Sequence, residues 1–204
     1  MDWLNQRTDR DTQFFGIVPE VIQIDDSKPV VQFNLIVFPN DWQKEPSPSP
    51  EKISEKQQKY KGFFQRLIDD LRDNHHFTNA RKGQYQSWYA FSSGFSGITY
   101  GASFAFGDRV RVDLYIGTNK RDNNKNIFDS LFEDKDNIES EIGCELGWER
   151  LDDKAASRVA IYREGSIDSD DKEIADILKW SVDYILKFRA VLHERLEQAI
   201  ENNN

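Results

Sequence analysis

Apolar and polar residues alternate strictly from Arg109 to Gly117, and this alternation is the clearest pattern in the chain. A period of two is typical of a strand that buries one face and presents the other to solvent. The apolar positions are Val110, Val112, Leu114 and Ile116, and the positions between them are Arg109, Arg111, Asp113 and Tyr115. The pattern predicts that these two sets lie on opposite faces of a sheet.

Two further strands are predicted before this one, over residues Trp88–Ser93 and Ile98–Phe106. Gly94–Gly97 and Gly107–Asp108 form short connections, so the three strands are expected to make an antiparallel meander. The residues expected on one face of the middle strand are Ile98, Tyr100, Ala102, Phe104 and Phe106.

Apolar residues recur at helical spacing in the other long segments of the main body. Asp170 followed by Glu173 resembles a capping box, which marks the start of the last of these helices. The predicted helices are Ser54–Asn74, Asn123–Ile142 and a segment from Asp170 through Leu196, and the predicted strands between the last two are Glu145–Leu151 and Ser157–Arg163.

The first 42 residues are predicted to form a separate helix-strand-strand piece. Its strands are expected at Ile17–Ile24 and Val30–Phe38, with a turn at Asp25–Pro29 between them. A piece of this length cannot bury a stable core by itself. It is therefore expected to pack on the rest of the chain or on another polypeptide.

A Pro- and Ser-rich segment, residues 43–55, separates this piece from the main body, residues 56–204. Alternating prolines favour extended polyproline II, which is typical of a linker. The order of elements in the main body is α-βββ-α-ββ-α. The chain is therefore predicted to be an α+β protein, with an antiparallel sheet of about five strands packed by helices and a small N-terminal appendage.

Composition narrows the classes of function. The net charge of −9 disfavours a protein that holds nucleic acid over a broad surface, because that affinity comes mainly from cations on phosphates. With 31% charged residues, no apolar run approaches the length of a membrane span. A lone cysteine, Cys144, and an N-terminus without signal-peptide features indicate a cytoplasmic protein with no membrane partner.

The sequence contains no complete motif for catalysis or for metal binding. His75 and His76 are adjacent at a predicted helix end, where the helix dipole favours them, and Cys144 has no co-ligand at the spacing of a zinc site. Gly94–Gly97 is not followed by a helix, unlike a phosphate-binding loop. The sequence predicts no catalytic residue, no metal and no cofactor, which favours a non-enzymatic protein.

The remaining candidate is a face that combines arginines with aromatic side chains. Arg109, Arg111 and Tyr115 project from one side of their strand, and Arg150 and Arg158 are expected on a similar side of the later strands. Guanidinium groups beside aromatic rings suit contacts with phosphates and bases. The same pattern also arises when outward arginines pair across strands with Asp113 and Glu149, and the sequence leaves both interpretations open.

Several short motifs, in their order along the chain, resemble the bacterial domain of unknown function 4268. The resemblance runs from about Lys59 to Leu196 and implies no established activity. The motifs are Arg109–Ile116 (RVRVDLYI), Ile127–Leu131 (IFDSL), Ile138–Gly143 (IESEIG), Leu146–Lys154 (LGWERLDDK) and Ala156–Tyr162 (ASRVAIY).

The N-terminal piece resembles the segment that precedes this domain in longer relatives, where it is similar to the end of a restriction-endonuclease-like nuclease domain. The motifs that carry this likeness include Phe14–Gly16, Ser27–Pro29 and Pro39–Trp42. The resemblance implies that the catalytic Asp and Glu-x-Lys residues would lie upstream of Met1. It therefore implies a nuclease neighbourhood and no catalytic residue in this chain.

These observations lead to a hypothesis of a non-catalytic accessory or recognition module associated with bacterial DNA processing or defence nucleases. Its expected partners are DNA or a nuclease subunit. The alternative hypothesis is a protein-interaction or dimerisation module without nucleic-acid contact, in which the N-terminal strands pair across a two-fold axis to form a homodimer.

Overall fold

The computed structural model describes residues 16–22, 30–37 and 53–203 of the chain. The chain divides into two compact units, which meet in the sequence between Ile53 and Ser54. The part of the predicted linker that precedes Ile53 lies outside the described residues.

The first unit contains a two-stranded antiparallel sheet formed by β1 (Gly16–Ile22) and β2 (Val30–Val37). Both predicted strands are therefore present, and Ile22 pairs with Val30 where the hairpin closes. The helix predicted before Gly16 and the turn at Asp25–Pro29 lie outside the described residues. A two-stranded sheet is marginally stable in water by itself, so this hairpin needs further packing.

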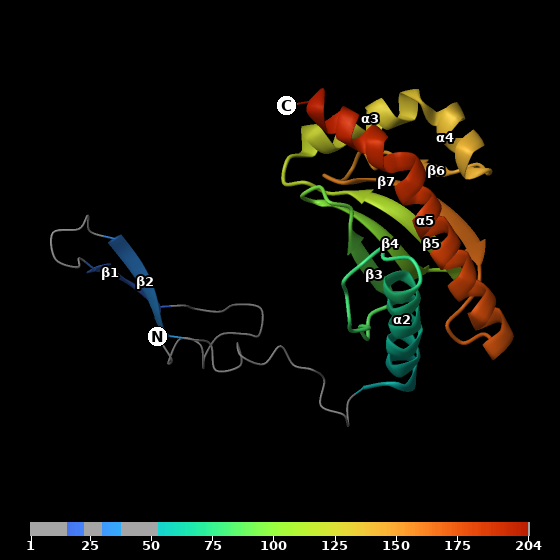
Figure 1. The fold of residues 1–204 in the computed structure, drawn as a ribbon, viewed down its shortest axis with the longest axis horizontal. Coiled ribbons are helices and arrows are strands. Elements are labelled where there is room, and N and C mark those ends of the chain that lie inside the picture. The colour runs from blue at the N-terminus through green and yellow to red at the C-terminus, as the bar shows by residue number, and fades with distance from the viewer. Residues whose placement is uncertain (1–15, 23–29, 38–52, 204) are drawn as a thin grey trace. The chain divides into compact units, whose positions relative to one another are not determined.

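The second unit is built on a five-stranded antiparallel sheet with the strand order β3-β4-β5-β7-β6 (Figure 1). Helices pack on this sheet, so the predicted α+β class is confirmed. The strands are β3 (Trp88–Ser92), β4 (Ile98–Ala105), β5 (Arg109–Ile116), β6 (Gly147–Glu149) and β7 (Ser157–Glu164), and the helices are α2 (Glu55–Asp73), α3 (Arg121–Glu133), α4 (Lys135–Ile142) and α5 (Asp171–Glu201).

Helices α2 and α5 begin where the sequence supplies side-chain caps. Ser54 and Gln57 form a reciprocal capping box at the start of α2, and the Asp170 carboxylate accepts a hydrogen bond from the Glu173 backbone N–H at the start of α5. Helix α5 is 31 residues long and extends beyond the predicted end near Leu196. No helix within residues 53–203 is long and apolar enough to cross a membrane.

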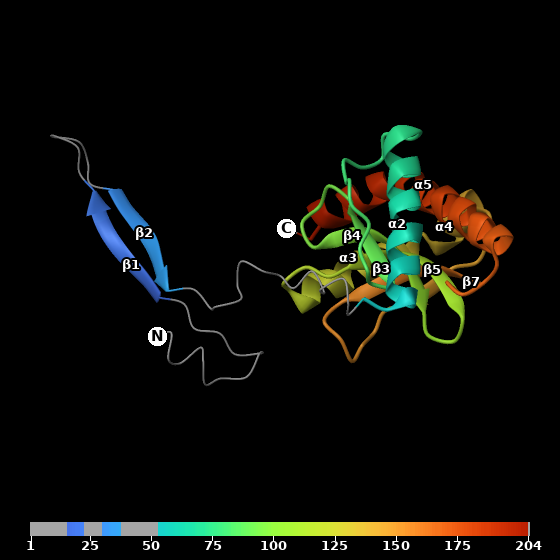
Figure 2. The same cartoon turned by 90° about the horizontal axis from the view of Figure 1, so that it is seen from below.

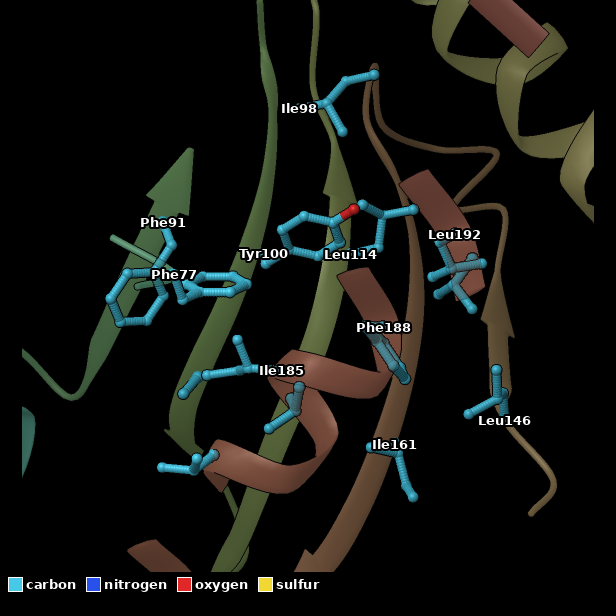
Figure 3. Packing of buried hydrophobic residues seen from close by; sticks show 14 of the residues in the cluster. Phe77, Phe91, Ile98, Tyr100, Leu114, Leu146, Ile161, Ile185, Phe188 and Leu192 are labelled. Carbon is cyan, nitrogen blue, oxygen red and sulfur yellow. The ribbon is translucent and has the colours of Figure 1, made fainter. Parts of the chain in front are cut away.

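One hydrophobic core lies between the helices and one face of the sheet. Helices α2 and α5 pack side by side next to the strands (Figure 2). In the core, Tyr100 of β4 and Leu114 of β5 lie in one layer with Phe188 and Leu192 of α5 (Figure 3). The alternating residues of β5 that were predicted to face inward are all buried, which confirms the assignment of its two faces.

The region predicted as one helix, Asn123–Ile142, is two helices that meet at Asp134. The Asp134 carboxylate accepts a hydrogen bond from the Asn137 side chain at 2.5 Å and binds the Arg195 guanidinium of α5 at 2.7 Å. These side-chain contacts hold Asp134 at the junction of the two helices and so stabilise the break.

Strand β6 is shorter than the predicted Glu145–Leu151. Before the strand, the Leu146 backbone N–H donates to the Glu139 carboxylate at 2.9 Å, and after it Leu151 has a positive φ of 53°. Both features take the backbone out of a strand conformation, so only three residues pair with β7.

Phe106 was predicted to face inward from β4, and this prediction is wrong. The strand ends at Ala105, and Phe106 lies in the turn to β5 with 97% of its surface exposed. Gly107 and Asp108 both have positive φ, which reverses the chain one residue earlier than the alternation of apolar residues indicated.

Candidate nucleic-acid interface

The sheet has a second face that points away from the helices, and we call it the outer face. None of its side chains belongs to the hydrophobic core formed by the described helices and strands. The outer face consists of Trp88, Ala90 and Ser92 of β3; Thr99, Gly101, Ser103 and Ala105 of β4; Arg109, Arg111, Asp113 and Tyr115 of β5; Arg158, Ala160, Tyr162 and Glu164 of β7; and Gly147 and Glu149 of β6.

Large side chains on the outer face lie in two rows on either side of a row of small residues. Each row follows the register of the strands, and side chains that pair across strands lie close enough to interact. The middle row has at most a methyl group at every position except Asp113. These three rows are Trp88, Ser103, Arg111 and Tyr162; Ala90, Gly101, Asp113, Ala160 and Gly147; and Ser92, Thr99, Tyr115, Arg158 and Glu149, and a fourth row at the end of the strands consists of Ala105, Arg109 and Glu164.

Asp113 is the centre of an ionic network that joins the two rows of large side chains. Its Oδ2 lies 2.8 Å from Nε of Arg111 and 3.0 Å from Nε of Arg158. Arg158 also donates from Nη1 to Oε2 of Glu149 at 2.9 Å, and the Tyr162 hydroxyl donates to Oε1 of the same carboxylate. Two arginines are thus matched by two carboxylates, so the centre of the outer face is close to neutral.

The network is largely closed to water even though none of helices α2 to α5 covers it. Asp113 is only 6% exposed, because the neighbouring long side chains lie over it. Burial raises the pKa of the Asp113 carboxyl, and the charges of Arg111 and Arg158 oppose that rise. Burial and the contact with Glu149 also raise the pKa of Tyr162, so its hydroxyl stays protonated and remains a donor.

Arg109 differs from the other two arginines of the outer face. It is exposed, and within the described residues it forms no ion pair. Its guanidinium carbon lies 5.0 Å from the centroid of the Tyr162 ring, a distance typical of a cation–π contact. Arg109 therefore holds a positive charge that other groups can still approach.

Two aromatic side chains of the outer face present rings to solvent. Trp88 is 49% exposed and Tyr115 is 38% exposed, although large aromatic residues are usually buried. The Tyr115 ring has the Arg158 guanidinium carbon 5.9 Å from its centroid. The outer face therefore combines exposed rings with an accessible arginine.

The structure brings four of the five predicted binding residues to this face: Arg109, Arg111, Tyr115 and Arg158. Arg150 is not among them. It follows the outward residue Glu149, so it points to the helix side, where Nε lies 2.8 Å from Oδ1 of Asp129 in α3. Arg158 makes the cross-strand pairs with Asp113 and Glu149 that were the alternative explanation of the pattern, and Arg111 pairs with Asp113 along its own strand.

Trp88 was not among the predicted binding residues, although its position could be found from the sequence. Tyr89 and Phe91 pack against the core, so the alternation of β3 places Trp88 and Ala90 on the outer face. Within the described residues, no group of three or more His, Cys, Asp or Glu side chains is arranged to hold a metal ion.

The comparison with protein families gives one match. Residues 59–196 match a family described as domain of unknown function (DUF4268). No curated protein and no solved structure matches the chain. All the residues of the outer face lie inside the matched range.

Proposed function

Because the chain belongs to the family known as domain of unknown function (DUF4268), whose description assigns no activity, we propose a function from the chemistry of the outer face. We propose a non-catalytic recognition module of bacterial DNA processing or defence that binds single-stranded DNA across this face. The observation that carries the proposal is a sheet face that none of helices α2 to α5 covers, on which Trp88 and Tyr115 present their rings. Arg109 is exposed on the same face and forms no ion pair among the described residues, although Glu164 lies opposite it on β7.

Exposed rings on a sheet are a common platform for unpaired bases. Each base that stacks on an aromatic side chain contributes about 1–3 kcal/mol to binding, largely independent of sequence. Bases in a duplex are stacked on one another and are not available to such rings. This chemistry favours a single strand over a duplex.

The charges of the ionic network also support the proposal. A strand of phosphates would be repelled by free carboxylates, but Asp113 and Glu149 are each paired with an arginine. Glu164, which forms no ion pair among the described residues, lies at the edge of the face opposite Arg109. Arg109 adds a positive charge at one end of the face. The net charge of −9 on the whole chain is a reason to expect few phosphate contacts and moderate affinity.

We further propose that the N-terminal piece connects this module to a nuclease. The support is its resemblance to the end of a restriction-endonuclease-like domain, together with the two-stranded sheet of β1 and β2, which is marginal without a neighbour. A nuclease subunit that supplies further strands would complete this sheet.

The alternative, a protein-interaction or dimerisation module, has an observation of its own. Phe106 is 97% exposed in the turn between β4 and β5, where it offers a large apolar side chain that another protein could bury. Light scattering on the full chain tests this alternative. A dimer that reverts to a monomer in the Phe106→Ser variant would favour it.

Fluorescence anisotropy with labelled DNA tests the leading proposal. The labelled DNAs are a duplex of about one helical turn and one of its strands alone. The protein is titrated into each DNA at low salt, where weak phosphate contacts are strongest. We expect the single strand to bind at least about tenfold more tightly than the duplex, as one stacked base implies. Equal affinities, or no binding of either DNA, would overturn the proposal.

A further inference from the structure

A pocket opens where the outer face meets the connection between β6 and β7. Its volume is about 310 Å³. This is near the lower end of the range for sites that bind small molecules, so it has room for about one nucleotide unit. The residues that line it are Tyr115, Gly117, Thr118, Asn124, Leu151, Lys154, Ala155, Ala156 and Arg158.

The charges distinguish this pocket from another of similar size. Lys154 and Arg158 both line it, and Lys154 is exposed and forms no ion pair within the described residues. The other pocket, also about 310 Å³, is lined by Phe95, Ile127 and Ile200 among others and has no charged side chain in its lining. Of these two pockets, the one beside Tyr115 has the chemistry to bind an anion.

Tyr115 forms an aromatic wall whose position depends on Gly117. A Cβ atom built on Gly117 would lie 2.4 Å from Cε1 of the Tyr115 ring, which is closer than real Cβ contacts. The ring therefore lies directly on the glycine backbone. Because the φ of Gly117 is outside the left-handed region, alanine can occupy the position only if the ring moves.

The opposite wall is held rigidly by buried polar groups. The Lys125 ammonium donates to the backbone carbonyls of Leu151 at 2.9 Å and Ala156 at 2.8 Å, and the Asn124 amide donates to the Ala155 carbonyl at 3.0 Å. Leu151 is held in the left-handed region, a conformation that a residue with a side chain rarely adopts and that surrounding contacts must maintain. A wall that is already fixed loses little entropy when a ligand binds.

We infer that this pocket binds one terminal nucleotide of a single strand, with its base against Tyr115 and its terminal phosphate beside Lys154 and Arg158. The inference rests on the proposed function, because the pocket shares Tyr115 and Arg158 with the outer face. It adds a preference for strand ends that the outer face alone does not have. The rest of the strand would continue from the pocket across the outer face.

The experiment compares linear and circular single-stranded DNA of one sequence. The linear strand is prepared with a 5′-phosphate, with a 3′-phosphate and with neither. We expect one of the two phosphorylated strands to bind about tenfold more tightly than the circle, as one charge-assisted contact implies. If the circle and all linear strands bind equally, the pocket does not recognise ends, although the proposed function stands. If none binds, the proposed function itself fails.

Two variants link the preference to the pocket. Lys154→Ala removes an exposed charge, and Gly117→Ala displaces the Tyr115 ring. Lys154→Ala is expected to abolish the preference for the phosphorylated end and to leave binding of the circle within about twofold. Gly117→Ala is expected to abolish the same preference and also to weaken binding of the circle, because Tyr115 belongs to the stacking platform. The matched controls are Lys179→Ala on α5 and Gly62→Ala, where an added Cβ meets no atom within 4 Å. An end preference that survives in Lys154→Ala would overturn the inference, whether or not Gly117→Ala folds.

Discussion

The Asp113 carboxylate lies directly on the backbone of Gly101, its cross-strand neighbour, so that a Cβ atom at position 101 would be 2.4 Å from Oδ1. The closeness explains how a carboxylate fits flat on a sheet beneath two arginines. The ionic network therefore requires a small residue at position 101.

Gly101→Ala is therefore expected to destabilise the protein. The added methyl group must push Asp113 away from Arg111 and Arg158, and such overpacking costs about 1–3 kcal/mol. Urea unfolding measures this loss. Gly62→Ala is the control: it meets no neighbour and should stabilise α2 by about 0.5–1 kcal/mol, because alanine favours a helix interior over glycine. Equal stabilities of Gly101→Ala and the wild type would show that the carboxylate is not confined.

The raised pKa of Asp113 predicts a specific pH dependence of stability. The folded protein keeps this proton at pH values where the unfolded chain, with a pKa near 3.8, has lost it. Because the folded state then binds more protons, the contribution of Asp113 to the unfolding free energy falls as the pH rises from 3.8 through the folded pKa.

Asp113→Asn isolates this contribution. Carboxylates paired with arginine, such as Asp129 and Glu141, have lowered pKa values and act in the opposite direction, since their stabilisation is lost as the pH falls. They are common to both proteins. The wild type should therefore lose stability relative to Asp113→Asn as the pH rises through this window. A relative gain would mean that the arginines outweigh the burial of the carboxylate.

Lys125→Met tests the rigid wall of the pocket. The methionine is similar in length but leaves several buried carbonyls without a donor, which costs about 2–3 kcal/mol. Thermal unfolding should show a clear loss of stability, whereas Lys179→Met on the exposed side of α5 should change little. If both variants melt at the same temperature, the Lys125 hydrogen bonds do not organise the connection between β6 and β7.

Trp88→Ala tests the stacking platform. The variant should fold normally, because the indole is 49% exposed, and should bind single-stranded DNA more weakly by about 1–3 kcal/mol. Phe132→Ala is the matched control, since Phe132 is similarly exposed on α3 and lies away from the outer face. Equal losses in the two variants would mean that the affinity does not come from the outer face.

Local periodicity was sufficient to predict the elements whose burial repeats regularly. The alternation in β5 and the apolar stripe of α2 each depend on residues close together in the sequence, and both elements are present within one or two residues of their predicted bounds. The break at Asp134 could not be predicted in this way. It depends on Arg195, which is 61 residues away and meets Asp134 only in the folded chain.

The sequence was sufficient to predict the face of the sheet for most candidate residues, but not the contacts that these residues make. Alternation placed Arg109, Arg111 and Tyr115 on one face. It could not show that Asp113, on the same face, is buried, because the burial depends on Arg158, which is far away in the sequence. Arg150 was grouped with these residues, although it has the same parity as Leu146 and Trp148, which pack against the core. Regular alternation therefore already places Arg150 on the helix side, where it meets Asp129 of α3.

The dependence of single-stranded DNA affinity on salt is the most direct test of the central claim, which is that the outer face binds the strand. If Arg109 neutralises one phosphate, Arg109→Ala should reduce the slope of log K against log salt by about 0.7. Arg66→Ala, which removes an exposed arginine from α2, should leave the slope unchanged. Equal slopes for the wild type and both variants, or equal reductions in the two variants, would contradict the account.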